Sequence, residues 1–291
     1  MRTLVFGGTG MLGRAVVAAA RRRGWQALGI SHRQGDVADA GRVRYWLGAF
    51  RPELLVNCAA FTRVDEAEQR RDEAFAVNGE AAGVLAAAAR EERIPLVHVS
   101  SDYVFAGGGE RRWREEDAPA PLSVYGESKR LGEERALSWD EALVVRSSWL
   151  FGPGGRNFVT TIVGLIDRGE TPLRVVDDQV GCPTYTPFLA AALCDLAARG
   201  ARGLVHYANR EPVSWYGFAR EIAGLWDARA EVAPVPTEAV PRPARRPAYS
   251  VLDTDRFSEL VGRVPEHWGW GLSEYLDALR RERAQQEARV R

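Results

Sequence analysis

A tyrosine and a lysine that lie four residues apart, Tyr125 and Lys129, have side chains and spacing suited to proton transfer. At this spacing two side chains share one face of a helix. A phenol can give its proton to the alkoxide that forms when a carbonyl group is reduced, and a neighbouring ammonium lowers the phenol pKa from about 10. Ser101 ends an apolar segment and adds a hydroxyl for the same substrate oxygen. The pattern predicts carbonyl reduction, although a Tyr/Lys pair of this spacing also occurs on ordinary helix surfaces.

Lys129 is the only lysine among the 39 basic residues of the chain, and all the others are arginine. An ammonium is a compact charge, whereas a guanidinium is planar and presents its donors differently. The sequence therefore favours a chemical requirement for lysine at this position. The alternative is that one lysine persists by chance in an arginine-rich chain.

Four glycines, Gly7, Gly8, Gly10 and Gly13, lie between a short apolar segment and a helical pattern. In this context glycines allow a tight turn and a close approach of the backbone to a pyrophosphate, which lies at the N-terminus of the helix. We therefore predict a dinucleotide site here, with a nicotinamide that delivers hydride to the carbonyl carbon and whose positive charge, together with the Lys129 ammonium, lowers the phenol pKa.

The segment after the second predicted strand indicates whether the protein prefers NAD or NADP. An acidic residue there binds the ribose 2′-hydroxyl of NAD, whereas basic residues accommodate the 2′-phosphate of NADP. This chain has Ser31, His32 and Arg33, and no acid before Asp36. We expect NADPH, with NADH as the alternative, because an arginine in a solvent-exposed loop has the same sequence pattern.

The elements that must position these residues alternate between strands and helices in the first half of the chain. Apolar segments predict strands, and amphipathic or alanine-rich segments predict helices. The expected elements are Thr3–Phe6, Leu12–Arg23, Gln26–Ile30, Leu54–Asn57, Asn78–Arg93, Leu96–Ser100, Gly126–Leu137 and Leu143–Arg146. This order is typical of βαβ units, so we predict an α/β fold with a Rossmann-type doubly wound parallel sheet.

The second half predicts a smaller C-terminal lobe that binds the substrate. Its expected elements are Asn157–Arg168, Leu173–Val176, Pro187–Ala198, Leu204–Ala208 and Ser214–Trp226. Residues 1–150 and the returning segment of about 185–212 are expected to form the dinucleotide-binding domain, and residues 151–184 and 213–291 the lobe. Pro234–Pro247 holds five prolines and predicts an extended surface loop. A polar helix is expected from Ser273.

Charge and composition exclude several functional classes. The 39 acidic and 39 basic residues balance, which argues against a nucleic-acid binder. No run of about 18 apolar residues predicts a membrane span, and no signal peptide is recognisable at the N-terminus. Three scattered cysteines, Cys58, Cys182 and Cys194, have neither zinc spacing nor a disulfide framework. We therefore expect a cytoplasmic enzyme without a metal site.

The spacing of Gly7, Gly10 and Gly13 together with Tyr125 and Lys129 is similar to that of the extended short-chain dehydrogenase/reductase superfamily. Within it, the chain resembles the dTDP-4-dehydrorhamnose reductases over nearly its whole length, to about Leu279. The segments that carry this closer resemblance are Val56–Thr62, Val64–Glu68, Ser101–Phe105, Pro121–Lys129, Arg146–Trp149, Asn157 and Phe158, Asp178–Thr184 and Arg245–Pro247.

This resemblance implies reduction of the C4 keto group of dTDP-4-dehydro-β-L-rhamnose to dTDP-L-rhamnose. It implies that Tyr125 is the proton donor and Lys129 its partner, with Ser101 in place of the usual threonine. It also implies two sets of binding residues. Those expected to line the cofactor are Gly7, Gly10, Met11, Leu12, Gly13, Arg33, Asp36, Val37, Ala59, Ala60, Phe61, Tyr125 and Lys129. Those expected to contact the substrate are Ser101, Asp102, Trp149, Asn157, Gln179 and Arg246.

One position departs from the family pattern. Some members place a glutamate two residues after the third glycine, as part of a magnesium-linked dimer contact, and this chain has Ala15 there. The resemblance still allows a homodimer, but the substitution predicts that no metal binds at this position and also argues against the dimer. Two rival functions remain open from the sequence: a nucleotide-sugar epimerase with the same Tyr/Lys chemistry, and a non-catalytic regulatory subunit of the kind that binds methionine adenosyltransferase.

Overall fold

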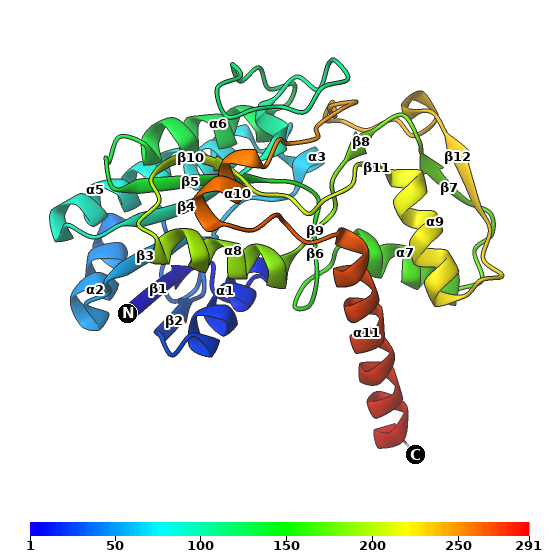
Figure 1. Cartoon of the computed structure of the whole chain (residues 1–291), viewed down its shortest axis with the longest axis horizontal. Helices are drawn as coiled ribbons and strands as arrows, with labels where there is room; N and C mark the ends of the chain where they lie inside the picture. Colours follow the sequence, from blue (N-terminus) through cyan, green and yellow to red (C-terminus); the bar gives the residue numbers. More distant parts are fainter. Residues whose placement is uncertain (291) are drawn as a thin grey trace.

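Six parallel strands form the central sheet of the protein, which is described here by a computed structural model covering residues 1–290 (Figure 1). The strands are β1 (Arg2–Phe6), β2 (Gln26–Ile30), β3 (Leu54–Asn57), β4 (Leu96–Ser101), β5 (Ala142–Ser147) and β10 (Gly203–His206). Their order is β10-β5-β4-β3-β1-β2, so the chain reverses its winding direction between β1 and β3. Ligands of doubly wound sheets bind at such a reversal, outside the carboxyl ends of the strands. The predicted Rossmann-type fold is confirmed.

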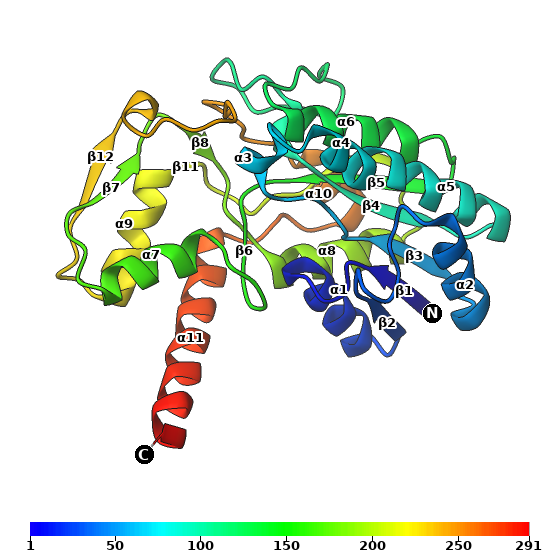
Figure 2. The same ribbon diagram turned by 180° about the vertical axis from the view of Figure 1, so that it is seen from behind.

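Helices cover both faces of this sheet (Figures 1 and 2). One face carries α1 (Met11–Arg22), α8 (Thr186–Ala198) and α10 (Asp255–Val261); the other carries α2 (Ala40–Phe50), α5 (Ala81–Glu92) and α6 (Val124–Ala136). Successive residues of a strand point to opposite faces. Accordingly Val5 packs with α1 and α8, whereas Leu4 and Phe6 pack with α2 and α5. Burial on both faces explains why these strands read as continuous apolar segments.

The region between β3 and β4 differs from the sequence prediction. Two short helices, α3 (Val64–Ala67) and α4 (Arg71–Ala74), lead into a π-helical segment, Phe75–Glu80, which continues into α5. The single helix predicted from Asn78 is therefore the end of a longer irregular run. Helix α2 was not predicted at all. Its N-terminus is capped by Asp39, which accepts a hydrogen bond from the Arg42 amide at 3.1 Å.

A second, smaller core lies beside the sheet (Figure 1). Its strands and helices are β6 (Leu150–Phe151), α7 (Phe158–Asp167), β7 (Leu173–Val176), β8 (Val180–Gly181), β9 (Thr184–Tyr185), β11 (Val213–Ser214), α9 (Trp215–Trp226), β12 (Val232–Val235) and α11 (Trp268–Val290). The strands pair as β6 with β9, β7 with β12 and β8 with β11. Aromatic side chains of α7, α9 and α11 fill this core. Its chain segments interleave with those of the large sheet.

Two predictions for this region were partly wrong. The proline-rich stretch begins inside strand β12, where Pro234 pairs with Val175 of β7. An edge strand tolerates proline because its outward N–H group has no ladder partner. The last helix begins at Trp268 rather than Ser273, and it extends away from the body of the molecule (Figure 2). Within residues 1–290, none of the helices combines the length and apolar character needed to cross a bilayer.

Candidate active site

Helix α6 brings Tyr125 to the carboxyl end of β4. The helix begins after Ser123, whose hydroxyl accepts a hydrogen bond from the Gly126 amide at 3.2 Å. A Cβ atom at Gly126 would lie 2.2 Å from the carbonyl oxygen of Tyr103, so the absence of a side chain lets the helix approach the turn after β4. The rings of Tyr103 and Tyr125 meet edge to face at 5.6 Å. Tyr125 also forms a hydrogen bond with Ser101, the last residue of β4.

Burial dominates the acidity of Tyr125. It raises the pKa of the phenol to about 12, a hydrogen bond with Ser101 lowers it, and the charge of Asp102 raises it. The sequence predicted that Lys129 and the positive nicotinamide together lower this pKa. Among the side chains of the fold, Lys129 is not one of the groups that shift the Tyr125 pKa, and its ammonium donates a hydrogen bond to the Val99 carbonyl oxygen at 2.7 Å. Near neutral pH the phenol therefore holds its proton and can act as an acid.

Lys129 is 2% exposed. Burial lowers the pKa of its ammonium to about 8, while the nearby Glu133 carboxylate, and to a lesser extent Cys58, raise it. A buried cation is disfavoured because it loses hydration, so its protonation depends on nearby negative charge. This places the titration of Lys129 close to the physiological range.

Asp102 follows Ser101 and is almost fully buried, with 1% exposure. The Ser101 hydroxyl donates a hydrogen bond to Asp102 Oδ1 at 2.9 Å. Burial raises the pKa of Asp102 to about 6, and hydrogen bonds with Ser250 and Ser101 lower it. The carboxylate orients the serine hydroxyl, which leaves Ser101 Oγ as an acceptor for a neighbouring donor.

The glycine-rich turn after β1 has two kinds of glycine. A Cβ atom at Gly13 would lie 2.1 Å from the Gly7 carbonyl oxygen, and one at Gly7 would lie 2.5 Å from the Ala59 amide nitrogen. Packing within the chain requires these two. A Cβ atom at Gly10 would meet only the Gly7 carbonyl oxygen, at 3.3 Å, with open space beyond. Gly10 is the N-cap of α1, and no side chain caps this helix. A bare backbone next to free helix N–H groups fits a pyrophosphate.

The loop after β3 is fastened from behind by two buried asparagines. Asn57 Oδ1 accepts a hydrogen bond from the Ala59 amide at 3.0 Å. Asn78 accepts one from the Phe61 amide at 2.7 Å and donates one to the Phe61 carbonyl oxygen at 3.1 Å. This role of Asn78 was not predicted from the sequence. A lone asparagine within an alanine-rich helical pattern was the available signal.

The remaining cofactor candidates lie at the end of β2. Asp36 Oδ1 accepts a hydrogen bond from the Ala38 amide at 3.0 Å and so shapes its own turn. Val37 is buried in the core, and Arg33 is exposed at the carboxyl edge of the sheet. Met11 and Leu12 form the first turn of α1. None of these positions conflicts with the predicted cofactor site.

Trp149 occupies an unusual position among the substrate candidates. Its backbone φ is +49°, a left-handed conformation that a bulky residue rarely adopts. Its indole stacks on that of Trp215 with ring centroids 3.5 Å apart, and a Cβ atom at Gly181 would lie 2.5 Å from Trp149 Cε2. The sequence did not predict that Trp215 and Gly181 hold this indole in place.

The other three substrate candidates are engaged within the chain. Asn157 caps α7 and also donates a hydrogen bond to the Tyr275 hydroxyl at 3.1 Å. Gln179 Nε2 donates to Thr237 Oγ1 at 2.9 Å. The guanidinium of Arg246 pairs with both carboxylate oxygens of Asp65, each at 3.0 Å. Their contacts with a substrate stay predictions.

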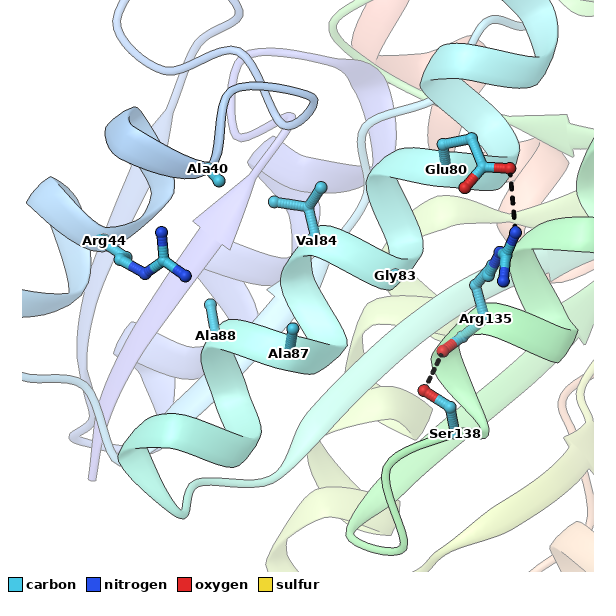
Figure 3. A pocket seen from close by; sticks show the side chains of 9 residues that line it. All are labelled: Ala40, Arg44, Glu80, Gly83, Val84, Ala87, Ala88, Arg135 and Ser138. Carbon is cyan, nitrogen blue, oxygen red and sulfur yellow. Dashed lines mark hydrogen bonds and ion pairs between the residues drawn. The ribbon is translucent and has the colours of Figure 1, made fainter.

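A surface hollow of about 520 Å³ lies elsewhere, between α2, α5 and α6 (Figure 3). Arg44 and the ion pair between Glu80 and Arg135 flank small side chains of α5 there. The hollow contains none of the candidate catalytic or binding residues. Its lining is largely a solvent-exposed helix surface.

The chain is similar to known proteins over nearly its whole length. A family model described as the RmlD substrate binding domain matches residues 1–281. A dTDP-4-dehydrorhamnose reductase of Streptomyces griseus is 40% identical, covering 96% of this chain and 94% of that protein. A dTDP-4-keto-6-deoxy-D-glucose reductase of Streptomyces niveus is 39% identical, covering 96% and 97%. The crystal structure of dTDP-4-dehydrorhamnose reductase from Bacillus anthracis in complex with NADP is 31% identical. It superimposes with a TM-score of 0.91 over 95% of this chain and 99% of that one.

Proposed function

The chain belongs to the family of the RmlD substrate binding domain, and from that premise we propose that it reduces the C4 keto group of dTDP-4-dehydro-β-L-rhamnose with NADPH to give dTDP-L-rhamnose. The observation that carries this proposal is the grouping of Ser101, Tyr125 and Lys129 at the carboxyl end of β4. Ordinary surface pairs of tyrosine and lysine are not buried in this way.

The chain's own residues supply and position the proton. Tyr125 keeps its proton near neutral pH and delivers it from the phenol oxygen to the C4 oxygen, while Ser101 holds that oxygen. Lys129 neutralises the phenolate that results. NADPH supplies the hydride when it is bound and leaves as NADP⁺, so one hydride and one proton convert the ketone to an alcohol.

The glycine turn and the loop after β3 are proposed to hold the cofactor. Met11 and Leu12 present the free N–H groups of the first turn of α1 to the pyrophosphate, and Gly10 lets the cofactor approach them without a side chain in the way. The backbone of Cys58 and Ala59 lies against Gly7, and the loop Ala59–Phe61 is proposed to close the other side. Arg33 is proposed to pair with the 2′-phosphate, since its side chain is exposed at this edge.

The smaller core is proposed to be the substrate lobe, with residues 151–184 and 213–291 as its bounds; α10 lies within these bounds but packs against the large sheet. The large domain is then residues 1–150 with the returning segment of about 185–212, which includes the edge strand β10. The proposed substrate contacts are Ser101, Asp102, Trp149, Asn157, Gln179 and Arg246. Four of these six, Trp149, Asn157, Gln179 and Arg246, follow strand β5 in the sequence.

We place the reaction in the cytoplasm, since the three cysteines are free thiols, which suits a reducing compartment. We also infer that any homodimer of this chain is independent of magnesium at α1. Ala15 there packs against the apolar core. Chelation with EDTA should therefore leave the mass measured by light scattering unchanged.

The proposal is tested by following NADPH absorbance with enzymatically prepared dTDP-4-dehydro-L-rhamnose. Wild-type protein should oxidise NADPH, and Tyr125→Phe should lower kcat by about 10²–10⁴-fold, the usual contribution of a general acid. Tyr45→Phe, at an exposed tyrosine, should behave as wild type. Folded, NADPH-binding protein that oxidises neither NADPH nor NADH with this sugar would refute the assignment.

A parallel reaction with dTDP-4-keto-6-deoxy-D-glucose tests the sugar specificity. A nucleotide-sugar epimerase instead carries tightly bound NAD through its cycle and consumes no reduced cofactor. Interconversion of epimers without net oxidation of NADPH would support that rival reading.

A further inference from the structure

Helix α6 and strand β4 meet in a regular register at the site. Tyr125, Lys129 and Glu133 are spaced by four residues, so they lie on one face of the helix. The face contacts residues 99–101, which are consecutive in β4: the first accepts a hydrogen bond from Lys129, and the last bonds with Tyr125. The middle residue, Ser100, donates its hydroxyl hydrogen to Glu133 Oε1 at 2.6 Å. Glu133 therefore lies on the same face of α6 as Tyr125 and Lys129, one helical turn beyond Lys129.

Glu133 is one half of a buried ion pair. Its two carboxylate oxygens accept hydrogen bonds from Arg146 Nε at 2.8 Å and from a terminal nitrogen of Arg146 at 2.7 Å. The side chains are 5% and 2% exposed, respectively. Arg146 lies opposite Ser100 in the pairing of β5 with β4. Its guanidinium also contacts His206 Nε2 of β10 at 3.3 Å. A buried ion pair typically adds little net stability compared with well-packed apolar residues, so a gain in stability does not explain why this pair is present.

The groups that face Lys129 from the surrounding elements leave Glu133 as its main anion. Cys58 follows β3, and burial raises the pKa of this thiol to about 12, which keeps it neutral. His98 lies in β4, and burial together with the Lys129 charge holds its pKa well below the ordinary value, so it is neutral too. Arg146 of β5 is cationic and is neutralised by Glu133. On α6 itself, Tyr125 keeps its proton and Glu133 carries the negative charge.

We propose that Glu133 is a positioning residue for the reduction, which keeps the Lys129 ammonium charged and directed at the end of β4, and that the Glu133–Arg146 pair exists to hold this carboxylate in place. Glu133 touches neither substrate nor cofactor in this role. It acts through Lys129, whose pKa it raises against the effect of burial. The kinetic part of the inference rests on the proposed function, but its electrostatic part does not.

The chain offers a direct measurement, because Lys129 is its only lysine. Protein grown with lysine labelled with ¹³C at Cε yields one lysine resonance, whose chemical shift against pH gives the pKa of Lys129 without any enzyme assay. Glu133→Gln should lower this pKa by about one unit or more, the size of effect expected from one close charge. Glu133→Asp should largely retain the wild-type value. Glu134→Gln is the matched control, since that neighbouring glutamate is exposed and pairs with Arg130.

Loss of Glu133 alone leaves Arg146 buried without its anion, which can prevent folding. The double variant Glu133→Gln with Arg146→Met removes both charges and should fold, and it should still show a lowered Lys129 pKa. A lysine resonance that titrates at the wild-type pH in either folded variant would overturn the proposal. In kinetics, the alkaline fall of kcat/KM should move to lower pH in Glu133→Gln, whereas a purely structural defect lowers activity equally at every pH. Wild-type protein without activity would count against the proposed function and leave the NMR result valid.

Discussion

Asn78 fastens the loop after β3 to the catalytic helix, and its truncation allows a worked estimate. Its side chain is 1% exposed and makes three hydrogen bonds: two with the backbone of Phe61 and one, at 3.0 Å, with Ser128 Oγ. In Asn78→Ala the buried N–H and C=O groups of Phe61 lose their partners. An unsatisfied buried polar group costs about 1–3 kcal/mol, so the two together predict a loss of about 2–6 kcal/mol.

Thermal unfolding measures this loss. For a chain of this size about 1 kcal/mol corresponds to a fall in Tm of about 2–4 °C, so Asn78→Ala should melt about 10 °C below wild type. NADPH binding should weaken as well, because Phe61 belongs to the proposed cofactor loop. Ser128→Ala removes one of the three bonds and should cost about 1 kcal/mol. Gln69→Ala, at an exposed amide in the same region, is the control. A Tm of Asn78→Ala within about 2 °C of wild type would show that the loop does not depend on these bonds.

Three further predictions follow from the site. Gly10→Ala should fold normally and bind NADPH weakly, whereas Gly13→Ala should lose stability as well, because its Cβ atom would lie 2.1 Å from a carbonyl oxygen; equal NADPH affinity in Gly10→Ala and wild type would exclude a pyrophosphate there. Arg33→Ala should lower kcat/KM for NADPH by about tenfold or more and leave NADH little changed, as expected for a lost charge-assisted hydrogen bond. Burial raises the pKa of Asp102 to about 6, so its contribution to stability is present at low pH and is lost as the pH rises through about 4 to 6. Asp102→Asn should therefore raise Tm relative to wild type more at about pH 7.5 than at about pH 4.5, and a pH-independent difference would contradict the burial argument.

The strands of the large sheet were predictable because each is a short apolar segment with a local turn signal. Strands β2 and β3 have the predicted ends, β1 and β4 differ by one residue at one end, and β5 is longer by one residue at each end. Helix α2 was missed because its pattern is weakly amphipathic, with Val43 and Leu47 as its buried residues. The π-helical segment before α5 was also missed, since its geometry follows from packing against α6 rather than from local preference.

In the candidate site, too, local features could be predicted from the sequence, whereas features that depend on tertiary contacts could not. The helical spacing of Tyr125 and Lys129 and the glycine turn are local features, so the sequence alone determined them, together with the doubly wound fold and the family. The direction in which Lys129 points, the raised pKa of Tyr125 and the pairing of Glu133 with Arg146 depend on residues brought together from different strands and helices. Burial acts on a charge through everything that surrounds it, so only the tertiary structure could decide which side chain carries a proton and which partner holds it.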